Sequence, residues 1–407
     1  MNNFFRNNFN LIKNYLSAGI GTILPAFFSL GSILMFSKTV GLEAFGSFVI
    51  IFSIVDLIDK VFGVSTWQAY QRFITKDNKK NLILTSNLFV TDVFFSFCSF
   101  FFSCLFIYLY SKFYFELNNY FYLIPVLGLS RASDLTIGIL RAKSEYLKLS
   151  YLATIGPFIR FLFTVIGFIY GYELSYFILL FFIDKIISLL LKTIYLIINK
   201  SSFSHEIKRL DEVYLFLRRI YFDSALRIIP RRLDVIILSF ITSSSFIGLF
   251  QIIKDLSVII NYAYDPLYQI LYRRYKEAGS KKSIYEFKKM TIFLIKISPL
   301  IMLVVNSIII YFVIIYYDQK LEDVFLISTL TVIPPIIGFM SLGCAPLISI
   351  WLNPKYLLKA QIYAVLIYVL ILIVSFLVSS PISVLCAGIF YYLIWFLYTY
   401  RYVRKNE

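Results

Sequence analysis

The sequence of 407 residues has few charged side chains and a single histidine. Only 15% of the residues are charged, whereas 59% are hydrophobic and 19% are aromatic. A soluble globular protein covers much of its surface with polar groups, and this chain has too few of them to do so. The composition therefore predicts an integral membrane protein.

The scarcity of histidine and the positions of the cysteines exclude several kinds of site. His205 has no second histidine to join it, so a His-based metal site and a choice of Ser–His or Cys–His catalytic pairs are not expected. The four cysteines lie in apolar runs without C-x-x-C spacing: Cys98, Cys104, Cys344 and Cys386. They are typical of buried free thiols, so no disulfide, zinc site or other cofactor is predicted.

The apolar residues are grouped in runs long enough to cross a bilayer. A hydrocarbon core about 30 Å thick needs about 20 helical residues, and helices satisfy their own backbone groups in lipid. The sequence predicts an all-α integral membrane protein with twelve transmembrane helices, at 15–37, 45–69, 82–110, 118–140, 149–170, 174–198, 221–242, 246–270, 291–316, 324–350, 357–378 and 381–400. No A-x-A cleavage pattern follows the first run, so we expect it to be retained.

The basic residues predict how the spans are oriented. With the N-terminus in the cytoplasm, the inner segments hold 26 Lys and Arg, and the outer loops hold three, Lys38, Lys112 and Lys320. Lys and Arg in short loops stay cytoplasmic, so both termini are predicted to be cytoplasmic. The net charge of +16 is thus an orientation signal, and no binding of nucleic acid is expected.

The outer loops are short, the longest having about eight residues around 318–323. A membrane glycosyltransferase or polymerase needs an extramembrane loop or domain to hold a sugar and a catalytic acid. That class of protein is therefore the disfavoured alternative, and we do not expect an enzyme.

A weak internal repeat appears when the chain is shifted by 202 residues. Gly46-Ser-Phe48 then falls on Gly248-Leu-Phe250, and Tyr70-Gln-Arg-Phe73 falls on Tyr272-Arg-Arg-Tyr275. We interpret this as two six-helix lobes in parallel orientation around a central cavity. The lobes are residues 1–200 and 221–407, joined by a cytoplasmic linker at 201–220. The alternative is that these residues only mark helix ends, where Tyr and Arg are common.

Nineteen ionisable residues lie within predicted spans, where each costs about 2.5–3.5 kcal/mol on insertion scales. Helices 2, 7 and 8 each carry polar residues along one face. The residues are Asp56, Asp59, Lys60, Gly63, Trp67 and Tyr70, then Asp223, Arg227, Arg231 and Asp234, then Gln251, Lys254, Asp255, Asn261, Tyr262, Asp265 and Gln269. Pairs such as Asp56–Lys60 and Asp223–Arg227 are spaced i, i+4, so a purely structural role is one interpretation.

The other interpretation is that these faces line a hydrophilic cavity. Arginine can hold phosphate with two parallel hydrogen bonds. The candidate substrate-binding residues are Arg227, Arg231, Lys60 and Lys254, and Pro230 is expected to kink the helix beside Arg231. For coupling to H⁺ or Na⁺ the candidates are Asp59, Asp255 and Asp265, and further cavity-lining residues are Asp56, Trp67, Asp223, Asp234, Asn261 and Gln251.

The other embedded charges are interpreted as structural. Arg131 with Asp134 and Asp184 with Lys185 are predicted to be local pairs, and Arg160 and Lys192 to reach the interface from helix ends. Asp92 shares a face with Ser96, Ser99 and Ser103, which favours a small-residue packing seam with one buried acid.

The chain resembles a known family, the polysaccharide (O-antigen, Wzx-type) flippases of the multidrug/oligosaccharidyl-lipid/polysaccharide (MOP) exporter superfamily. The matching passages are Gly41-Leu-Glu-Ala-Phe-Gly46-Ser-Phe48 with Tyr70-x-Arg72-Phe73, and Arg232-Leu-Asp234 with Ile247-Gly248-Leu-Phe250. The resemblance implies a MATE-like fold and a bacterial inner-membrane flippase for undecaprenyl-diphosphate-linked oligosaccharide, working by alternating access. Its expected partners are that substrate, membrane lipids and polysaccharide polymerase or assembly proteins.

The alternative within the same superfamily is a multidrug antiporter for organic cations. Such a protein should need a cavity dominated by acidic residues, and the arginine pair of helix 7 argues against it.

Overall fold

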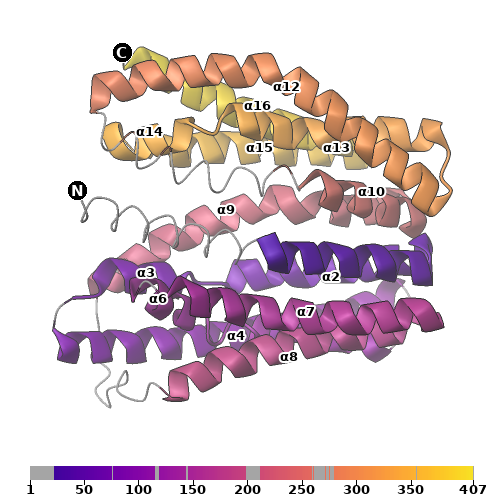
Figure 1. Ribbon diagram of the computed structural model, residues 1–407, viewed down its shortest axis with the longest axis horizontal. Helices are drawn as coiled ribbons and strands as arrows, with labels where there is room; N and C mark the ends of the chain where they lie inside the picture. The colour runs from indigo at the N-terminus through magenta and orange to yellow at the C-terminus, as the bar shows by residue number, and fades with distance from the viewer. Residues whose placement is uncertain are drawn as a thin grey trace, which may run out of the picture. The chain divides into compact units, whose positions relative to one another are not determined.

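The computed structural model of the chain describes residues 23–75, 77–114, 119–143, 145–198, 211–258, 260, 271, 275, 279–353 and 355–406. Nearly all of them are helical (Figure 1), as expected for backbone that must satisfy its hydrogen bonds in lipid. A helix over residues 23–40 is followed by α2 (Leu42–Phe62), α3 (Thr66–Phe73), α4 (Asn78–Tyr114), η1 (Asn119–Leu123), α5 (Val126–Leu129), α6 (Leu135–Ala142), α7 (Tyr146–Tyr170), α8 (Leu174–Ile198), α9 (Asp211–Ile241), α10 (Ser244–Ser257), α12 (Ser280–Tyr317), α13 (Leu321–Met340), α14 (Cys344–Trp351), α15 (Lys355–Val378) and α16 (Pro381–Lys405).

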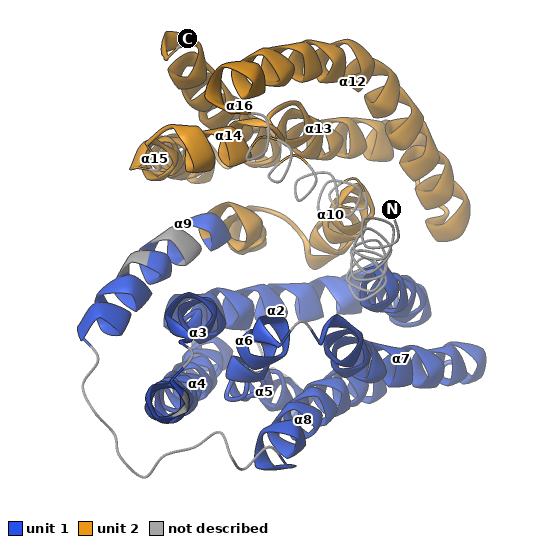
Figure 2. Ribbon diagram, turned by 60° about the vertical axis from the view of Figure 1, so that its left-hand side comes forward, with its two compact units in different colours: residues 1–228 blue, residues 229–407 orange. Residues whose placement is uncertain are grey.

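The chain forms two compact units, residues 1–228 and 229–407 (Figure 2). The boundary between them falls inside α9, between Ile228 and Ile229. The predicted linker at 201–220 lies partly outside the described residues, and its remaining part, 211–220, is the first part of α9.

Within the described residues, eight helices are long and apolar enough to cross a membrane. They are Ile23–Val40, Lys79–Lys112, Tyr146–Tyr170, Leu174–Ile198, Ser280–Tyr317, Leu321–Trp351, Lys355–Val378 and Pro381–Lys405. The other four predicted spans are 45–69, 118–140, 221–242 and 246–270. The first and third contain the charged helices α2 and α9, the second contains short helices, and the fourth contains α10 together with residues that lie outside the described part of the chain. Twelve spans therefore remain a prediction.

Three predicted spans contain an interruption of the regular helix. The span at 45–69 is interrupted at 63–65, the span at 118–140 is divided among η1, α5 and α6, and the span at 324–350 is interrupted at 341–343. At the first interruption the backbone of Gly63 is extended, with φ −73° and ψ 112°. As a result, the predicted polar face of helix 2 belongs to two helices, with Asp59 on α2 and Trp67 on α3.

The long helix α4 organises the packing of unit 1. It contacts α2, α3, α5 and α6, and its Leu84 and Leu88 share a buried cluster with Leu135 and Ile139 of α6. Burial of these apolar side chains fixes α4 beside the two interrupted spans of unit 1, at 45–69 and 118–140. The polar residues that follow on α4, from Asp92 onward, are therefore placed beside the interruptions.

Helix boundaries in the two units recur with the shift seen in the sequence. Helix α2 begins at Leu42 and α10 at Ser244, and α4 begins at Asn78 and α12 at Ser280, so both pairs are 202 residues apart. In unit 1, the long helix α4 is followed by an interrupted span and then by two long apolar helices, α7 and α8. In unit 2, α12 is followed in the same way by an interrupted span and then by α15 and α16. The same order of elements thus occurs in both units.

Candidate functional site

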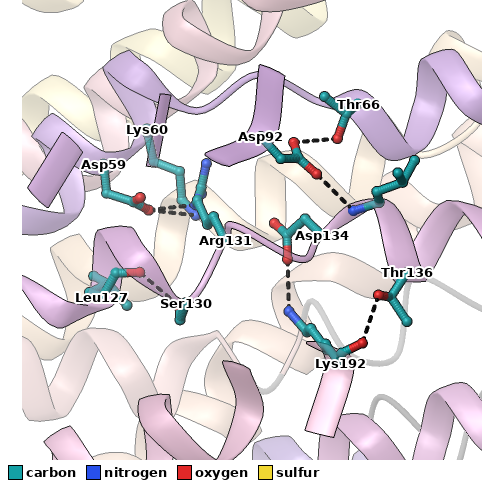
Figure 3. A network of polar contacts seen from close by, with 11 residues as sticks. Asp59, Lys60, Thr66, Asp92, Leu127, Ser130, Arg131, Asp134, Thr136 and Lys192 are labelled. Carbon is teal, nitrogen blue, oxygen red and sulfur yellow. Dashed lines mark hydrogen bonds and ion pairs between the residues drawn. The ribbon is translucent and has the colours of Figure 1, made fainter. Parts of the chain in front are cut away.

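The interruptions in two spans of unit 1 bring together charged side chains from α2, α4, α8 and the turn before α6 (Figure 3). Asp59 lies near the end of α2, Asp92 lies on α4, and Arg131 lies in the turn between α5 and α6. Backbone that leaves the helix inside a membrane protein persists only where polar groups can satisfy it. We call this set, together with Asp134 and Lys192, the junction network.

Asp59 and Arg131 form a buried ion pair in this network. Nε of Arg131 donates to Oδ2 of Asp59 at 2.6 Å, and the hydroxyl of Ser99 donates to Oδ1 at 3.4 Å. Nζ of Lys60 lies 3.8 Å from the Asp59 carboxylate and 3.9 Å from that of Asp56. Since Asp59 is only 1% exposed, these cations provide the compensation that a buried carboxylate needs.

Gly63 gives Arg131 the space to reach Asp59. A methyl group at Gly63 would overlap with Nη1 of Arg131 and would lie 2.9 Å from the carbonyl oxygen of Asp59. A residue without Cβ is therefore required where the guanidinium crosses the end of α2.

Asp92 joins the first residues of two short helices. The hydroxyl of Thr66, the first residue of α3, donates to Oδ1 of Asp92 at 2.5 Å. The backbone N–H of Leu135, the first residue of α6, donates to Oδ2 at 2.9 Å. Both helix N-termini favour a negative charge at this position, and Asp92 is 4% exposed.

Asp134 and Lys192 connect the network to α8. Nζ of Lys192 lies 2.7 Å from Oδ1 of Asp134, and the hydroxyl of Thr136 donates to the backbone carbonyl of Lys192 at 3.2 Å. The two contacts attach α8 to the N-terminal end of α6 (Figure 3).

A small pocket lies inside the junction network. Its volume is about 10 Å³, which is close to the smallest volume that holds one water molecule. Its lining combines two carboxylates, two hydroxyls and one guanidinium with apolar groups, namely Asp59, Phe62, Gly63, Val64, Asp92, Phe95, Ser96, Ser99 and Arg131.

A second buried cluster in unit 1 joins α7 to α8. Nη1 of Arg160 lies 2.8 Å from Oδ2 of Asp184, and Nζ of Lys185 lies 3.3 Å from the same oxygen. The ring of Phe181 contacts both cations, at 4.4 Å from Cζ of Arg160 and 5.4 Å from Nζ of Lys185. Gly156 leaves the space that Asp184 occupies, so this cluster fixes how the two helices pack.

In unit 2, Pro230 and Lys254 change the backbone bonding of α9. Nζ of Lys254 lies 2.6 Å from Oδ2 of Asp234 and donates to the carbonyl of Arg231 at 2.8 Å. The N–H of Val235 bonds to Oδ1 of Asp234 at 2.8 Å, and proline supplies no N–H to the preceding turn. Lys254 is thus held by α9 and is not a free cation.

The other charged residues of α9 and α10 differ in their surroundings. Gln251 donates to Oδ1 of Asp255 at 2.7 Å. Arg227 and Arg231, one turn apart on α9, have exposed side chains. Arg231 forms no ion pair with the described part of the chain.

Comparisons with solved structures identify the fold. No protein-family model and no curated protein sequence matches the chain. A multidrug resistance MATE family transporter of the MOP superfamily in an inward-facing conformation matches with a TM-score of 0.70 and 12% identity, over 95% of this chain and 98% of that one. The chain has a MATE-like fold.

Two further structures with the MATE fold extend the comparison. An outward-facing MATE family transporter matches with a TM-score of 0.67 and 13% identity, over 97% of this chain and 96% of that one. A MOP superfamily transporter from Pyrococcus furiosus Vc1, for which reverse polarity of the binding pocket suggests a different function, matches with a TM-score of 0.67 and 14% identity, over 97% of this chain and 95% of that one.

On this MATE fold, several charged residues have other partners than the sequence suggests. Arg131 pairs with Asp59 and not with Asp134, and Lys192 pairs with Asp134. Arg160 is 5% exposed and pairs with Asp184, so it does not extend to the interface. The reason is common to all of them, because each bond crosses between helices and has no signature in the spacing along one helix.

The predicted site residues are distributed over both units. Asp56, Asp59, Lys60 and Trp67 lie in unit 1, where Arg141 stacks on the Trp67 ring with Cζ 4.4 Å from its centroid. Asp234, Gln251, Lys254 and Asp255 lie in unit 2. Asn261 and Asp265 lie outside the described residues, as does the side chain of Asp223. Asp92, Arg131, Asp134 and Lys192 were not predicted as site residues, although Pro125 and the small residues after it could have indicated the interruption.

Proposed function

We propose that this protein is a flippase that moves undecaprenyl-diphosphate-linked oligosaccharide from the cytoplasmic to the periplasmic leaflet of a bacterial inner membrane. The observation that carries the proposal is the exposure of Arg227 and Arg231 on α9. An exposed arginine inside a bilayer cannot face lipid cheaply, so it marks a path that water and polar substrates can enter.

Two arginines one turn apart suit a pyrophosphate group. Each guanidinium offers parallel N–H donors that match two phosphate oxygens. Arg231 is available for this role because it has no carboxylate partner in the described residues, whereas Lys254 is held by Asp234 at 2.6 Å. The proposal assigns pyrophosphate binding to the two arginines and a supporting electrostatic role to Lys60 and Lys254.

Alternating access supplies the mechanism, and no covalent chemistry is needed. The MATE fold is represented among solved structures by both an inward-facing and an outward-facing transporter. In the proposed cycle, each state opens the arginine face to one leaflet, both termini stay cytoplasmic, and the lipid tail remains in the bilayer. The partners are the lipid-linked glycan, membrane lipids and the enzymes that polymerise or assemble the polysaccharide.

The test is to deplete the protein from its natural host. The expected result is loss of the surface polysaccharide together with accumulation of lipid-linked repeat units in the cytoplasmic leaflet. Undiminished surface polysaccharide in a strain without a second flippase would overturn the proposal. Purified protein in liposomes should move a lipid-linked oligosaccharide but not an organic cation.

A multidrug antiporter is the second candidate, because two of the solved structures with this fold are multidrug resistance transporters. It predicts that depletion increases sensitivity to organic cations and leaves the polysaccharide unchanged. The depletion strain therefore separates the two functions in one experiment.

A further inference from the structure

Three lysines lie in a row on one exposed face of α12. Lys282, Lys289 and Lys296 recur at every seventh residue, and the side chains of all three are exposed. Seven residues make nearly two helical turns, so the three side chains project from the same side of the helix. With a rise of about 1.5 Å per residue, the row extends about 21 Å along α12. We call these residues the lysine row, and none of them forms an ion pair with the described part of the chain.

The lysine row lies opposite the face by which α12 packs in unit 2. Helix α12 (Figure 1) contacts α10, α13 and α14. The buried residues in its first half are Ser283, Phe287, Thr291, Leu294 and Ser298. At about 100° per residue, these side chains project about 160° away from the lysine row. The row therefore lies on the side of α12 that the other helices of unit 2 leave uncovered.

Large apolar and aromatic side chains share this uncovered face. They are Tyr285, Ile292, Phe293, Leu300 and Leu303, and each is more than half exposed. Helix α12 is long and apolar enough to cross a membrane, so an exposed apolar face on it is in contact with lipid. The lysine row thus runs from the end of the helix into a lipid-facing surface.

Lys296 distinguishes this surface from an ordinary lipid-facing one. It lies about 7.5 Å inside the predicted span at 291–316, whereas the other two lysines precede the span. A helical side chain leans toward the helix N-terminus, which is the predicted cytoplasmic end of α12. The ammonium of Lys296 can therefore extend along the helix to the level of the lipid phosphates. There an anion stabilises a charge that lipid tails do not.

The fold itself does not require lysines on this face. The shift of 202 residues that relates α12 to α4 places Phe94 at the equivalent of Lys296, and Phe94 is 61% exposed. It places Asn87, which is buried, at the equivalent of Lys289. Only the first lysine of the row has a lysine at the equivalent position of α4. The two lysines nearest to the membrane core are thus particular to unit 2.

We propose that the lysine row binds one anionic phospholipid of the cytoplasmic leaflet. The phosphate lies between Lys289 and Lys296, and the acyl chains lie along Phe293, Leu300 and Leu303. Charge complementarity favours this occupant, because lysines close to a membrane surface attract anionic headgroups. A zwitterionic headgroup offers the same phosphate but carries a cation that cancels its charge. A soluble phosphate has no chains to cover the apolar part of the face.

Thermal unfolding of the purified full-length protein in detergent tests the binding. The protein is titrated with dioleoyl-phosphatidylglycerol, with dioleoyl-phosphatidylcholine, which has the same acyl chains, and with inorganic phosphate. We expect phosphatidylglycerol to raise the melting temperature in a saturable way, at a several-fold lower concentration than phosphatidylcholine. Equal effects of the two lipids would overturn the proposal. An equal effect of inorganic phosphate would also overturn it, since the acyl chains would then contribute nothing.

A lysine of unit 1 provides the matched control variant. Lys143 is exposed at the end of α6, on the same predicted side of the membrane as the lysine row. Lys296→Gln should raise the phosphatidylglycerol concentration for half-maximal stabilisation about fivefold, the effect of one lysine near a membrane surface. Lys143→Gln should leave that concentration unchanged. Equal shifts for the two variants would show that the lipid responds to the overall charge and not to the row.

A double variant tests whether the two inner lysines act together. Lys289→Gln combined with Lys296→Gln should abolish the preference for phosphatidylglycerol over phosphatidylcholine. Both side chains are exposed, so the double variant should melt at the same temperature as the unchanged protein without added lipid. A preference that survives the double change would overturn the proposal.

The lipid site goes beyond the proposed function and does not rest on it. Arg231→Ala, which should impair flipping, should bind phosphatidylglycerol as the unchanged protein does. Loss of the lipid preference in Arg231→Ala would place the lipid at the arginine face of α9 and overturn the lysine row as its site. Conversely, the lipid preference would stand even if the cargo proved to be an organic cation.

Discussion

The burial of the Asp59–Arg131 ion pair determines how it should respond to mutation. Removing one partner of a buried pair leaves the other charge uncompensated, at a cost of about 3–5 kcal/mol. Asp59→Ala should therefore lower the free energy of unfolding by about that amount, because Arg131 then loses the carboxylate with which it pairs. The measurement is thermal or denaturant unfolding of the purified protein.

Glu43 on the same helix provides the control for this prediction. Its side chain is exposed in the first turn of α2, so Glu43→Ala should cost at most about 1 kcal/mol through the helix dipole. Equal losses for Asp59→Ala and Glu43→Ala would show that the pair contributes no more than a surface charge.

Arg231 should matter more to transport than a similar arginine elsewhere on α9. Charge-assisted hydrogen bonds contribute about 1.5–3 kcal/mol each, so Arg231→Ala should weaken substrate binding by about ten- to a hundredfold. Arg231→Lys should retain part of the activity, because the charge remains but the planar pair of donors is lost. The measurement is flipping of a lipid-linked oligosaccharide in liposomes.

Arg218 is the suitable control for Arg231. It is exposed on the same helix but lies in the predicted cytoplasmic linker, so Arg218→Ala should flip the substrate normally. Arg232 is less suitable, since it is only partly exposed. Unchanged flipping by Arg231→Ala would remove the arginine face from the mechanism.

Among the helices, the interruption between α2 and α3 depends on one glycine. Gly63→Ala should displace Arg131, because the new methyl group would overlap with its guanidinium. The expected loss of stability is about 1–3 kcal/mol, as for other overpacked sites. Unfolding measurements should show the loss, and a combined Gly63→Ala and Arg131→Ala variant should lose less than the sum of the single changes.

Gly338 on α13 serves as the matched control for Gly63. Its closest neighbour to an added methyl group would be the Tyr392 ring at 3.4 Å, an ordinary contact. Gly338→Ala should therefore be neutral or slightly stabilising, since alanine favours helix over glycine. A loss as large as that of Gly63→Ala would point to a general intolerance of alanine in these helices and not to the close approach of Arg131.

The helices that could be predicted from sequence are those where hydropathy is the controlling property. Predicted spans at 149–170, 174–198, 357–378 and 381–400 lie within or closely match α7, α8, α15 and α16. The interruptions inside three of the predicted spans were not predicted, because hydropathy averaged over the length of a span does not register a local change of backbone direction. Gly63 and Pro125 are local signals, but each residue is also common in unbroken transmembrane helices.

For the molecule as a whole, the spacing of the polar residues predicted which of them share a helix face but not which of them meet across helices. Asp59 was predicted as a candidate for ion coupling, and its ion pair with Arg131, which reaches it from the turn before α6, was not predicted. Such partners depend on how α2, α4 and α6 pack, which one sequence does not specify. Lys254 was predicted as a substrate-binding residue, and its ion pair with Asp234 of the neighbouring helix was likewise not predicted.

The orientation of the whole chain gives the last prediction. The excess of Lys and Arg in alternate loops places Tyr172 and Lys320 outside and Lys143 and Asn406 inside. All four side chains are exposed, so single cysteines at these positions in a cysteine-free background can react with a membrane-impermeant maleimide. In sealed spheroplasts, Tyr172→Cys and Lys320→Cys should be labelled, and the other two only after permeabilisation. The reverse pattern would invert the topology. A mixed pattern would mean that one of the four spans 45–69, 118–140, 221–242 and 246–270 does not cross the bilayer. Each missing crossing would place every later loop on the opposite side of the membrane.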